Sequence, residues 1–401
     1  MSKSFSILGK NIKANSAADL EPYLSELKSM EDVEEVHFGA NSLGVEACEA
    51  IAEVLKTKKN LKVVDLADIF TGRLISEIPQ ALSALCNALI ESTSLVELDL
   101  SDNAFGGRCA DSMVPFLEGN LHFSIFKLNN NGLGPIGGSI IAKALIKNAE
   151  NAKFKNQESK LEVIVCGRNR LENGSSKDWK KAFGLHNNLK EIKLPQNGIR
   201  PEGIINLVEG LSKCPELILL DLQDNTSTNK GTRSISKIIS SWPNLESLNL
   251  SDCLLGKKGG LSLMNQFQNG SNQKLKSLKL QYNELTKESI EILSIAITQH
   301  LKELKELELN GNRFQEDDDC VEELKKALAV WDNEDALDEL DDMEEPESGD
   351  EDDEEEDDEE EEEDEDEKDE GADGADQLPP VTDKQTDDLA DMLAGAHIEA
   401  K

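Results

Sequence analysis

Three consecutive asparagines, Asn129, Asn130 and Asn131, follow the apolar segment FSIFKL and carry side chains that could act on another molecule. An amide both donates and accepts hydrogen bonds, so an exposed one can orient a polar group of a partner. In the motif L-x-L-x-x-N, the residues after the second leucine project outward and the asparagine turns inward. We therefore expect Asn131 to be buried, and Asn129 and Asn130 to be exposed.

Mostly polar residues occupy the same two positions in other copies of this motif, and we expect them to form an exposed rim. The matching pairs are Ser101 and Asp102, Gly167 and Arg168, Pro195 and Gln196, Gln223 and Asp224, and Ser251 and Asp252. A rim rich in Asp, Asn and Gln suits a polar or basic partner. For any single one of these residues, an ordinary solvated side chain is the simpler interpretation.

Signatures of a self-contained enzyme are missing from the sequence. The five histidines (His37, His122, His186, His300 and His397) show no metal-ligand spacing. The seven cysteines occur singly, without a CxxC pair, which favours core packing in a reducing setting. The glycine-rich GLGPIGG lacks the Lys-Ser/Thr of a phosphate-binding loop. We therefore expect no cofactor, no metal and no substrate pocket.

An internal repeat positions these polar residues. The pattern L-x-x-L-x-L-x-x-N/C-x-L begins at ten places: Val33, Leu61, Leu95, Phe123, Leu161, Leu189, Leu217, Leu245, Leu275 and Leu304. Most of the steps between them are 28 to 30 residues, which leaves room for one strand and one helix per repeat. Strands are narrower than helices, so the array must curve with its strands on the concave side. This predicts an α/β leucine-rich-repeat solenoid, a crescent of the ribonuclease-inhibitor type.

Irregularities in the repeat suggest domain limits and a special loop. We expect an N-terminal cap over 1–32, the solenoid over 33–331 and a separate tail over 332–401. Two steps are long, at 34 and 38 residues. The second long step contains KNAENAKFKNQESK, which is polar and compatible with a helix, and a surface loop is the simpler interpretation. The first contains Ile69 where the turn asparagine belongs, and a repeat that abandons its own turn chemistry has acquired another task.

Nearly all of the net charge of −39 lies in the tail. Residues 332–401 hold 37 acidic residues and three lysines, which leaves a net charge of about −5 for residues 1–331. Such a tail cannot bury apolar surface and should be disordered, apart from a short helix that could form in TDDLADMLAGAHI. The charge disfavours nucleic acid and anionic membranes as partners. With no signal peptide or long apolar run, we expect a cytoplasmic protein.

Several segments that the repeat does not require resemble the Ran GTPase-activating protein family. They are ADIFTGR (67–73), SDNAFG (101–106), NNGLGP (130–135), CGRNRLENGS (166–175), QNGIRPEG (196–203), LDLQDNT (220–226) and QYNE (281–284). The resemblance implies a crescent that binds the small GTPase Ran in its GTP form, alone or with a Ran-binding protein, and accelerates hydrolysis in support of nucleocytoplasmic transport. This sequence is similar to the shorter, freely cytoplasmic members of the family, and we expect the protein to be a monomer.

The resemblance also implies roles for individual residues. Asn130, the first asparagine of NNGLGP, would fix the GTPase's own catalytic glutamine, without an arginine finger. Arg73 in IFTGR would then be an interface or loop-shaping residue, and Ile75 stands where relatives carry a lysine. The expected partner-binding residues are Arg73, Asp102, Asn129, Arg168, Arg170, Gln196, Asp224 and Asp252.

Two other classes of protein remain open from the sequence. Acidic histone chaperones and phosphatase inhibitors also join leucine-rich repeats to acidic tails, but their repeats are usually fewer and shorter. A scaffold resembling ribonuclease inhibitor shares the 28-residue step, but such proteins typically have many more cysteines. Deletion of 332–401 separates a chaperone, which should lose its activity, from a GTPase activator, which should keep most of it.

Overall fold

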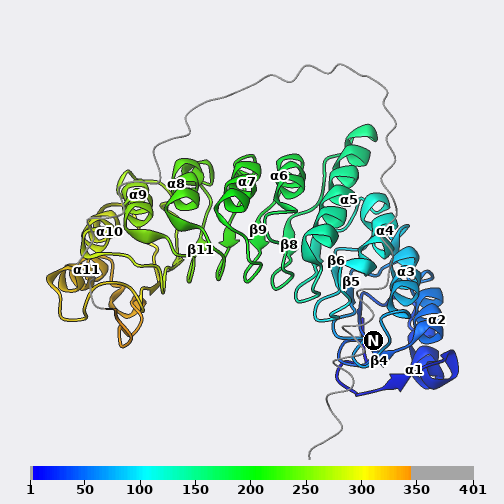
Figure 1. Ribbon diagram of the computed structural model, residues 1–401. Coiled ribbons are helices and arrows are strands. Elements are labelled where there is room, and N and C mark those ends of the chain that lie inside the picture. The colour runs from blue at the N-terminus through cyan, green and yellow to red at the C-terminus, as the bar shows by residue number, and fades with distance from the viewer. Residues whose placement is uncertain (1–2, 345–401) are drawn as a thin grey trace, which may run out of the picture. The chain divides into compact units, whose positions relative to one another are not determined.

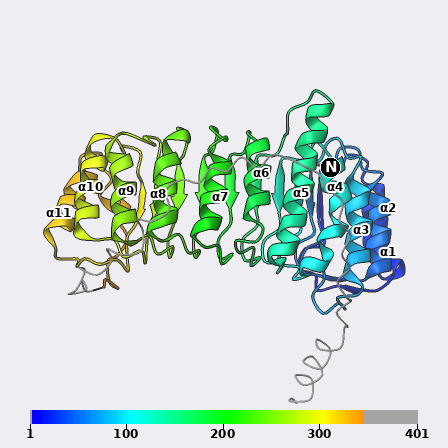
Figure 2. The ribbon, with the colours of Figure 1, turned by 45° about the horizontal axis from the view of Figure 1, so that its top comes forward.

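The structure, a computed structural model, describes residues 3–344. These residues form a curved array with the strands along the concave side and the helices along the convex side (Figure 1). In a view onto the helices, successive helices lie side by side in one row (Figure 2). The leucine-rich-repeat crescent expected from the sequence is confirmed.

Eleven short parallel strands form one sheet within the described residues, in the order in which they occur along the chain. They are β1 (Ser4–Ser6), β3 (Glu35–His37), β5 (Val63–Asp65), β6 (Glu97–Asp99), β7 (Ile125–Lys127), β8 (Val163–Val165), β9 (Glu191–Lys193), β10 (Leu219–Asp221), β11 (Ser247–Asn249), β12 (Ser277–Lys279) and β13 (Glu306–Glu308). The central residue of each strand is apolar and buried, as Phe126 and Ile164 illustrate. The residues on either side of it face the concave surface, because strand side chains alternate.

The convex layer is made by α1 (Ala17–Ser29), α2 (Val45–Leu55), α3 (Ile78–Leu89), α4 (Val114–Gly119), α5 (Gly134–Phe154), α6 (Ser176–Leu185), α7 (Pro201–Leu211), α8 (Thr228–Ile238), α9 (Gly256–Gln268), α10 (Lys287–Gln299) and α11 (Asp319–Ala329). Helix α7 shows why these segments fold so. Pro201 starts it at a position where no N–H is needed. Ile204, Leu207, Val208 and Leu211 then form one buried stripe.

Helix α5 explains the glycine-rich segment and the longest repeat. A Cβ added to Gly137 would lie 2.9 Å from the Cα of Gly107, so glycine permits close packing of α5 on the preceding turn. The polar surplus expected as a surface loop instead lengthens this helix as far as Phe154, and only the residues from Lys155 onward form a loop. The reason is composition, since KNAENAKF is rich in helix-forming residues.

The first 32 residues and residues 332–344 complete the two ends of the array, so the expected limit at 331 lies too early in the chain. The first 32 residues contain β1 and α1, and β1 pairs in parallel with β3, so this segment is a terminal member of the sheet. At the other end, residues 332–344 pack against β13, where Leu337 forms a parallel bridge with Leu307. The Asp338 carboxylate accepts hydrogen bonds from the N–H groups of Leu309 and Asn310, at 2.9 and 3.1 Å. The acidic run and the short helix expected near the C-terminus lie outside the described residues.

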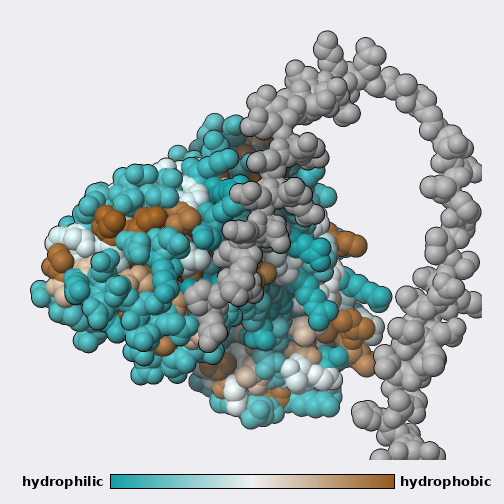
Figure 3. Space-filling model, turned by 60° about the vertical axis from the view of Figure 1, so that its left-hand side comes forward, coloured by the Kyte–Doolittle hydropathy of each residue, from teal (hydrophilic) through white to brown (hydrophobic). Residues whose placement is uncertain are grey.

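The face in Figure 3 is largely hydrophilic, with small and separate apolar areas. Two exposed apolar side chains, Leu74 and Ile75, lie in the loop between β5 and α3. Among the helices described, none is sufficiently long and apolar to span a bilayer.

Candidate functional site

A row of turn residues follows the strands along one edge of the crescent. We call it the rim row: Ala40, Asp68, Asp102, Asn130, Arg168, Gln196, Asp224, Asp252 and Tyr282. Every member has a positive φ, between 51° and 60°. The backbone N–H of each donates to a carbonyl of the next repeat, as Asn130 does to Gly167 at 2.9 Å. The backbone therefore fixes the direction in which each side chain leaves the turn.

The side chains of the rim row from Asp102 to Tyr282 are exposed, but of the residues directly before them only Gln223 is exposed. Ser101, Gly167 and Ser251 are buried, and Asn129 is half-buried, so the expectation of exposed pairs is wrong for the first member of these pairs. The physical reason is the close stacking of turns. The Ser101 hydroxyl accepts from the Asn129 N–H at 3.1 Å, and a Cβ on Gly167 would lie 2.7 Å from the Asn129 amide oxygen.

An asparagine ladder lies directly beneath the rim row, as the sequence predicts. Asn131 has no exposed surface, and its amide accepts from the Asn103 N–H at 2.9 Å and donates to the Leu100 carbonyl at 3.0 Å. At the irregular repeat, Ile69 cannot supply such an acceptor. The Asn41 N–H there donates to the Asp68 carbonyl instead, at 3.1 Å.

Asn130 is the exposed neighbour of this ladder residue. Its Nδ2 donates to Asp102 Oδ1 at 2.9 Å, across one repeat. Within residues 3–344 its amide oxygen has no hydrogen bond, so it is free to accept one from a partner. The structure thus separates two adjacent asparagines into a buried structural residue and an exposed, oriented amide.

Two arginines lie just beyond Asn130 along the rim. Arg168 occupies the next place in the rim row, and Arg170 lies two residues further on. Both are exposed, and neither guanidinium group has an ion pair or hydrogen bond to the described part of the chain. Gln196 and Asp224 follow and are joined by a hydrogen bond of 2.8 Å, with the exposed Asp252 beyond them. The structure therefore brings together all the predicted site residues except Arg73 on one edge.

Arg73 lies apart from the rim row, in the loop between β5 and α3. Its guanidinium donates to the carbonyls of Ala14 and Ser42, at 2.8 and 2.5 Å. It also donates to Asn15 Oδ1 at 2.5 Å. All three acceptors belong to the first two repeats, so Arg73 ties this loop to the N-terminal end of the array. Of the two roles expected for Arg73, the contacts favour loop shaping.

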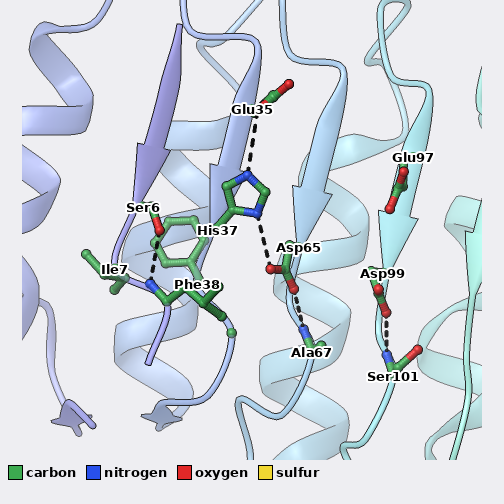
Figure 4. Close-up of polar contacts among 12 residues, drawn as sticks. Ser6, Ile7, Glu35, His37, Phe38, Asp65, Ala67, Glu97, Asp99 and Ser101 are labelled. Carbon is green, nitrogen blue, oxygen red and sulfur yellow. Dashed lines mark hydrogen bonds and ion pairs between the residues drawn. The ribbon is translucent and has the colours of Figure 1, made fainter. Parts of the chain in front are cut away.

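Carboxylates on the concave face near the N-terminal strands were missed by the sequence analysis (Figure 4). His37 lies between Glu35 and Asp65, with nitrogen–oxygen distances of 3.8 and 3.2 Å. Asp65 and Asp99 each accept from the N–H two residues onward, at 3.0 and 2.9 Å. Burial raises the pKa of Asp99. The repeated sequence D-L-x-D, whose first Asp is the last residue of the strand, could have revealed these carboxylates. An Asp at that position indicates a turn-forming role.

Within the part of the chain that the structure describes, we find neither a metal site nor a reactive thiol. No group of three or more His, Cys, Asp or Glu residues there could hold a metal ion. The seven cysteines are buried thiols, and burial raises the pKa of Cys86 to about 12. A thiol with so high a pKa is a poor nucleophile.

Known proteins resemble this chain over most of its length. A family model described as "Leucine Rich repeat" matches residues 91–110, 243–264 and 271–294. Ran GTPase-activating protein 1 of Saccharomyces cerevisiae is 38% identical over 330 residues, which cover 80% of this chain and 81% of that protein. Ran GTPase-activating protein 1 of Xenopus laevis is 42% identical over 197 residues, 48% of this chain and 34% of the frog protein.

A more distant similarity connects the chain to ribonuclease inhibitor. Ribonuclease inhibitor of Sus scrofa is 25% identical over 290 residues, 72% of this chain and 59% of that protein. The yeast protein is more similar, and the match to it extends over about four-fifths of both chains. On the strength of that match, this chain belongs to the Ran GTPase-activating protein family.

Proposed function

We propose that this protein is a GTPase activator that stimulates hydrolysis of the GTP bound to Ran. Membership of the family supports the activity, since four curated relatives with this activity in their names match the chain. The single structural observation that supports the mechanism is Asn130, an exposed amide whose orientation is fixed and whose oxygen is free.

The chemistry is in-line attack of water on the γ-phosphorus of GTP. The bond between the γ-phosphorus and the bridging oxygen breaks, and GDP and inorganic phosphate leave. The GTPase supplies a glutamine that orients the attacking water. Asn130 would hold that glutamine in place, because one amide can donate to and accept from another. The activator would thus complete an active site that belongs to Ran.

An arginine finger is not needed in this proposal. A finger must be free to enter the nucleotide site, where it can contribute about 10³–10⁵ in rate. The Arg73 guanidinium instead donates to three acceptors of its own chain, and leaving them would cost those hydrogen bonds. Arg168 is unpaired within residues 3–344 and lies beside Asn130, so we assign it to partner binding.

The remaining expectations belong to the same proposal. The protein would act as a monomer on GTP-bound Ran, alone or together with a Ran-binding protein. It would act in the cytoplasm, where low levels of Ran-GTP give nucleocytoplasmic transport its direction. Partner-binding roles are proposed for Asp102, Asn129, Arg170, Gln196, Asp224 and Asp252, while Arg73 would shape the adjoining loop.

Single-turnover hydrolysis tests the activity and the residue together. Ran loaded with GTP is mixed with catalytic amounts of this protein, and phosphate release is followed in time. We expect strong acceleration by the wild type and little by Asn130→Ala. Absence of acceleration by the wild type would overturn the activity. Full acceleration by Asn130→Ala would overturn only the role of Asn130.

A shortened chain separates the activator from an acidic chaperone. Residues 1–344 include all the described repeats and every proposed site residue. An activator of this kind should keep most of its effect on Ran when residues 345–401 are deleted. A histone chaperone should lose histone binding on the same deletion, because its acidic tail carries the charge that binds basic proteins.

A further inference from the structure

The hydrogen bond between Asp102 and Asn130 joins two neighbouring members of the rim row. Both backbones are fixed: each residue has a positive φ, 60° for Asp102 and 54° for Asn130. The Asp102 N–H donates to the Asn129 carbonyl at 2.8 Å, and the Asn130 N–H donates to the Gly167 carbonyl at 2.9 Å. Only the side-chain torsions remain free, and the bond of 2.9 Å between the side chains restrains them.

The chemistry of the pair selects one orientation of the amide. The two ends of an asparagine amide have nearly the same shape, so shape alone does not decide which end faces a neighbour. An ionised carboxylate only accepts hydrogen bonds. Reversal of the Asn130 amide would place its oxygen against Asp102 and would exchange an attraction for a repulsion. Asp102 therefore keeps the NH₂ group on its own side and leaves the amide oxygen available.

Other neighbours do not compete for this bond. On the far side of Asp102, the Asp68 carboxylate is engaged by the Thr71 hydroxyl. On the far side of Asn130, Arg168 forms no ion pair with Asp102 in the described part of the chain. Asp102 is thus the sole side-chain partner of Asn130 among residues 3–344.

We propose that Asp102 is a positioning residue, which holds the Asn130 amide in the one orientation that can engage the catalytic glutamine of the GTPase. This inference rests on the proposed function, in which Asn130 contacts that glutamine. It assigns to Asp102 an effect on the rate of hydrolysis within the complex, beyond the partner contact expected from the sequence.

The experiment separates rate from binding. Single-turnover hydrolysis is measured with the full-length activator in excess over Ran-GTP at a series of concentrations, which gives a maximal rate and a half-saturating concentration. We expect Asp102→Ala to lower the maximal rate about tenfold, a loss typical of a hydrogen bond to a charged group. The half-saturating concentration should change less than about twofold. A simple partner contact would give the opposite pattern.

Two further variants test the coupling to Asn130. Asp102→Asn tolerates the same backbone conformation and can still accept through its own amide oxygen, so it should recover part of the rate. Ran should hydrolyse GTP no more slowly with the double variant Asp102→Ala/Asn130→Ala than with Asn130→Ala alone. Without the Asn130 amide, Asp102 has no group to position. An independent further loss in the double variant would overturn the proposal.

A matched control is available on the convex side. Gln80 donates to Glu49 at 3.0 Å, also between an exposed amide and a carboxylate of adjacent repeats. Glu49→Ala should leave the maximal rate unchanged. Circular dichroism and the thermal midpoint establish that each variant is folded, and Asp102→Asn carries the test if Asp102→Ala is not.

The outcomes distinguish the inference from the function beneath it. If the wild type fails to accelerate hydrolysis, the proposed function fails. If the wild type is active and Asn130→Ala is not, but folded Asp102→Ala keeps the full maximal rate, only the role of Asp102 is overturned.

Discussion

Replacement of Asn131 by alanine should cost stability, whereas the same change at Asn130 should mainly cost activity. Asn131→Ala leaves the buried Asn103 N–H without its acceptor at 2.9 Å. The Leu100 carbonyl loses one donor but keeps another, since Asn103 Nδ2 donates to it at 2.9 Å. One orphaned buried N–H costs about 1–3 kcal/mol, and the cavity adds to this. We expect a loss of about 3 kcal/mol in the free energy of unfolding.

Asn130→Ala loses one exposed hydrogen bond and places alanine at a φ of 54°, which together should cost about 1 kcal/mol. Urea denaturation followed by circular dichroism measures both variants. Hydrogen exchange at the Asn103 amide adds a local reading, because a repeat array can open locally. Equal destabilisation by the two changes would refute the division of roles between the two asparagines.

A third variant provides the matched control for the ladder. Cys253 naturally occupies a ladder position, and its thiol donates to the Leu222 carbonyl at 3.2 Å. Asn131→Cys should therefore destabilise the protein less than Asn131→Ala does. A loss as large as that of alanine would show that a thiol donor contributes little at this position.

Three other expectations concern groups away from the rim. Burial lowers the pKa of His186 to about 4, so the unfolded chain binds a proton more readily between pH 6.5 and 4. About 3 kcal/mol of stability should be lost as the pH falls through this window, and urea denaturation should show a weaker pH dependence for His186→Phe. Arg73→Ala should lower the free energy of unfolding by about 2 kcal/mol, because three hydrogen bonds are lost, and Arg73→Lys should not restore it. A thousandfold loss in the stimulated rate of GTP hydrolysis, with unchanged stability, would instead indicate an arginine finger. A chain ending at Trp331 should melt at a lower temperature than one ending at Glu344, because it leaves the edge of β13 uncovered; equal melting temperatures would contradict this.

Much of the architecture could be predicted because the repeat imposes it many times over. The ten motif starts predicted ten of the strands, and the inward turn of Asn131 followed from its place in the motif. The first strand was missed because Ser2 and Lys10 stand where the motif has its first leucine and its asparagine, although Phe5 and Ile7 are buried. The packing of residues 332–344 on β13 was missed because the segment was assigned to the tail on its acidic composition, although it contains Leu337 and Leu340.

The sequence by itself determined the periodicity, the curvature and which asparagine of each turn faces inward. These follow from the alternation of apolar and polar residues in each strand and from the spacing of the apolar residues, both of which recur in every repeat. Only the tertiary structure decided what the polar side chains touch. Arg73 meets its three acceptors 31 to 59 residues away in the chain, and Asp102 meets Asn130 across one repeat. Such contacts depend on how turns stack and on torsions that no periodic pattern encodes, and the candidate site is built from them.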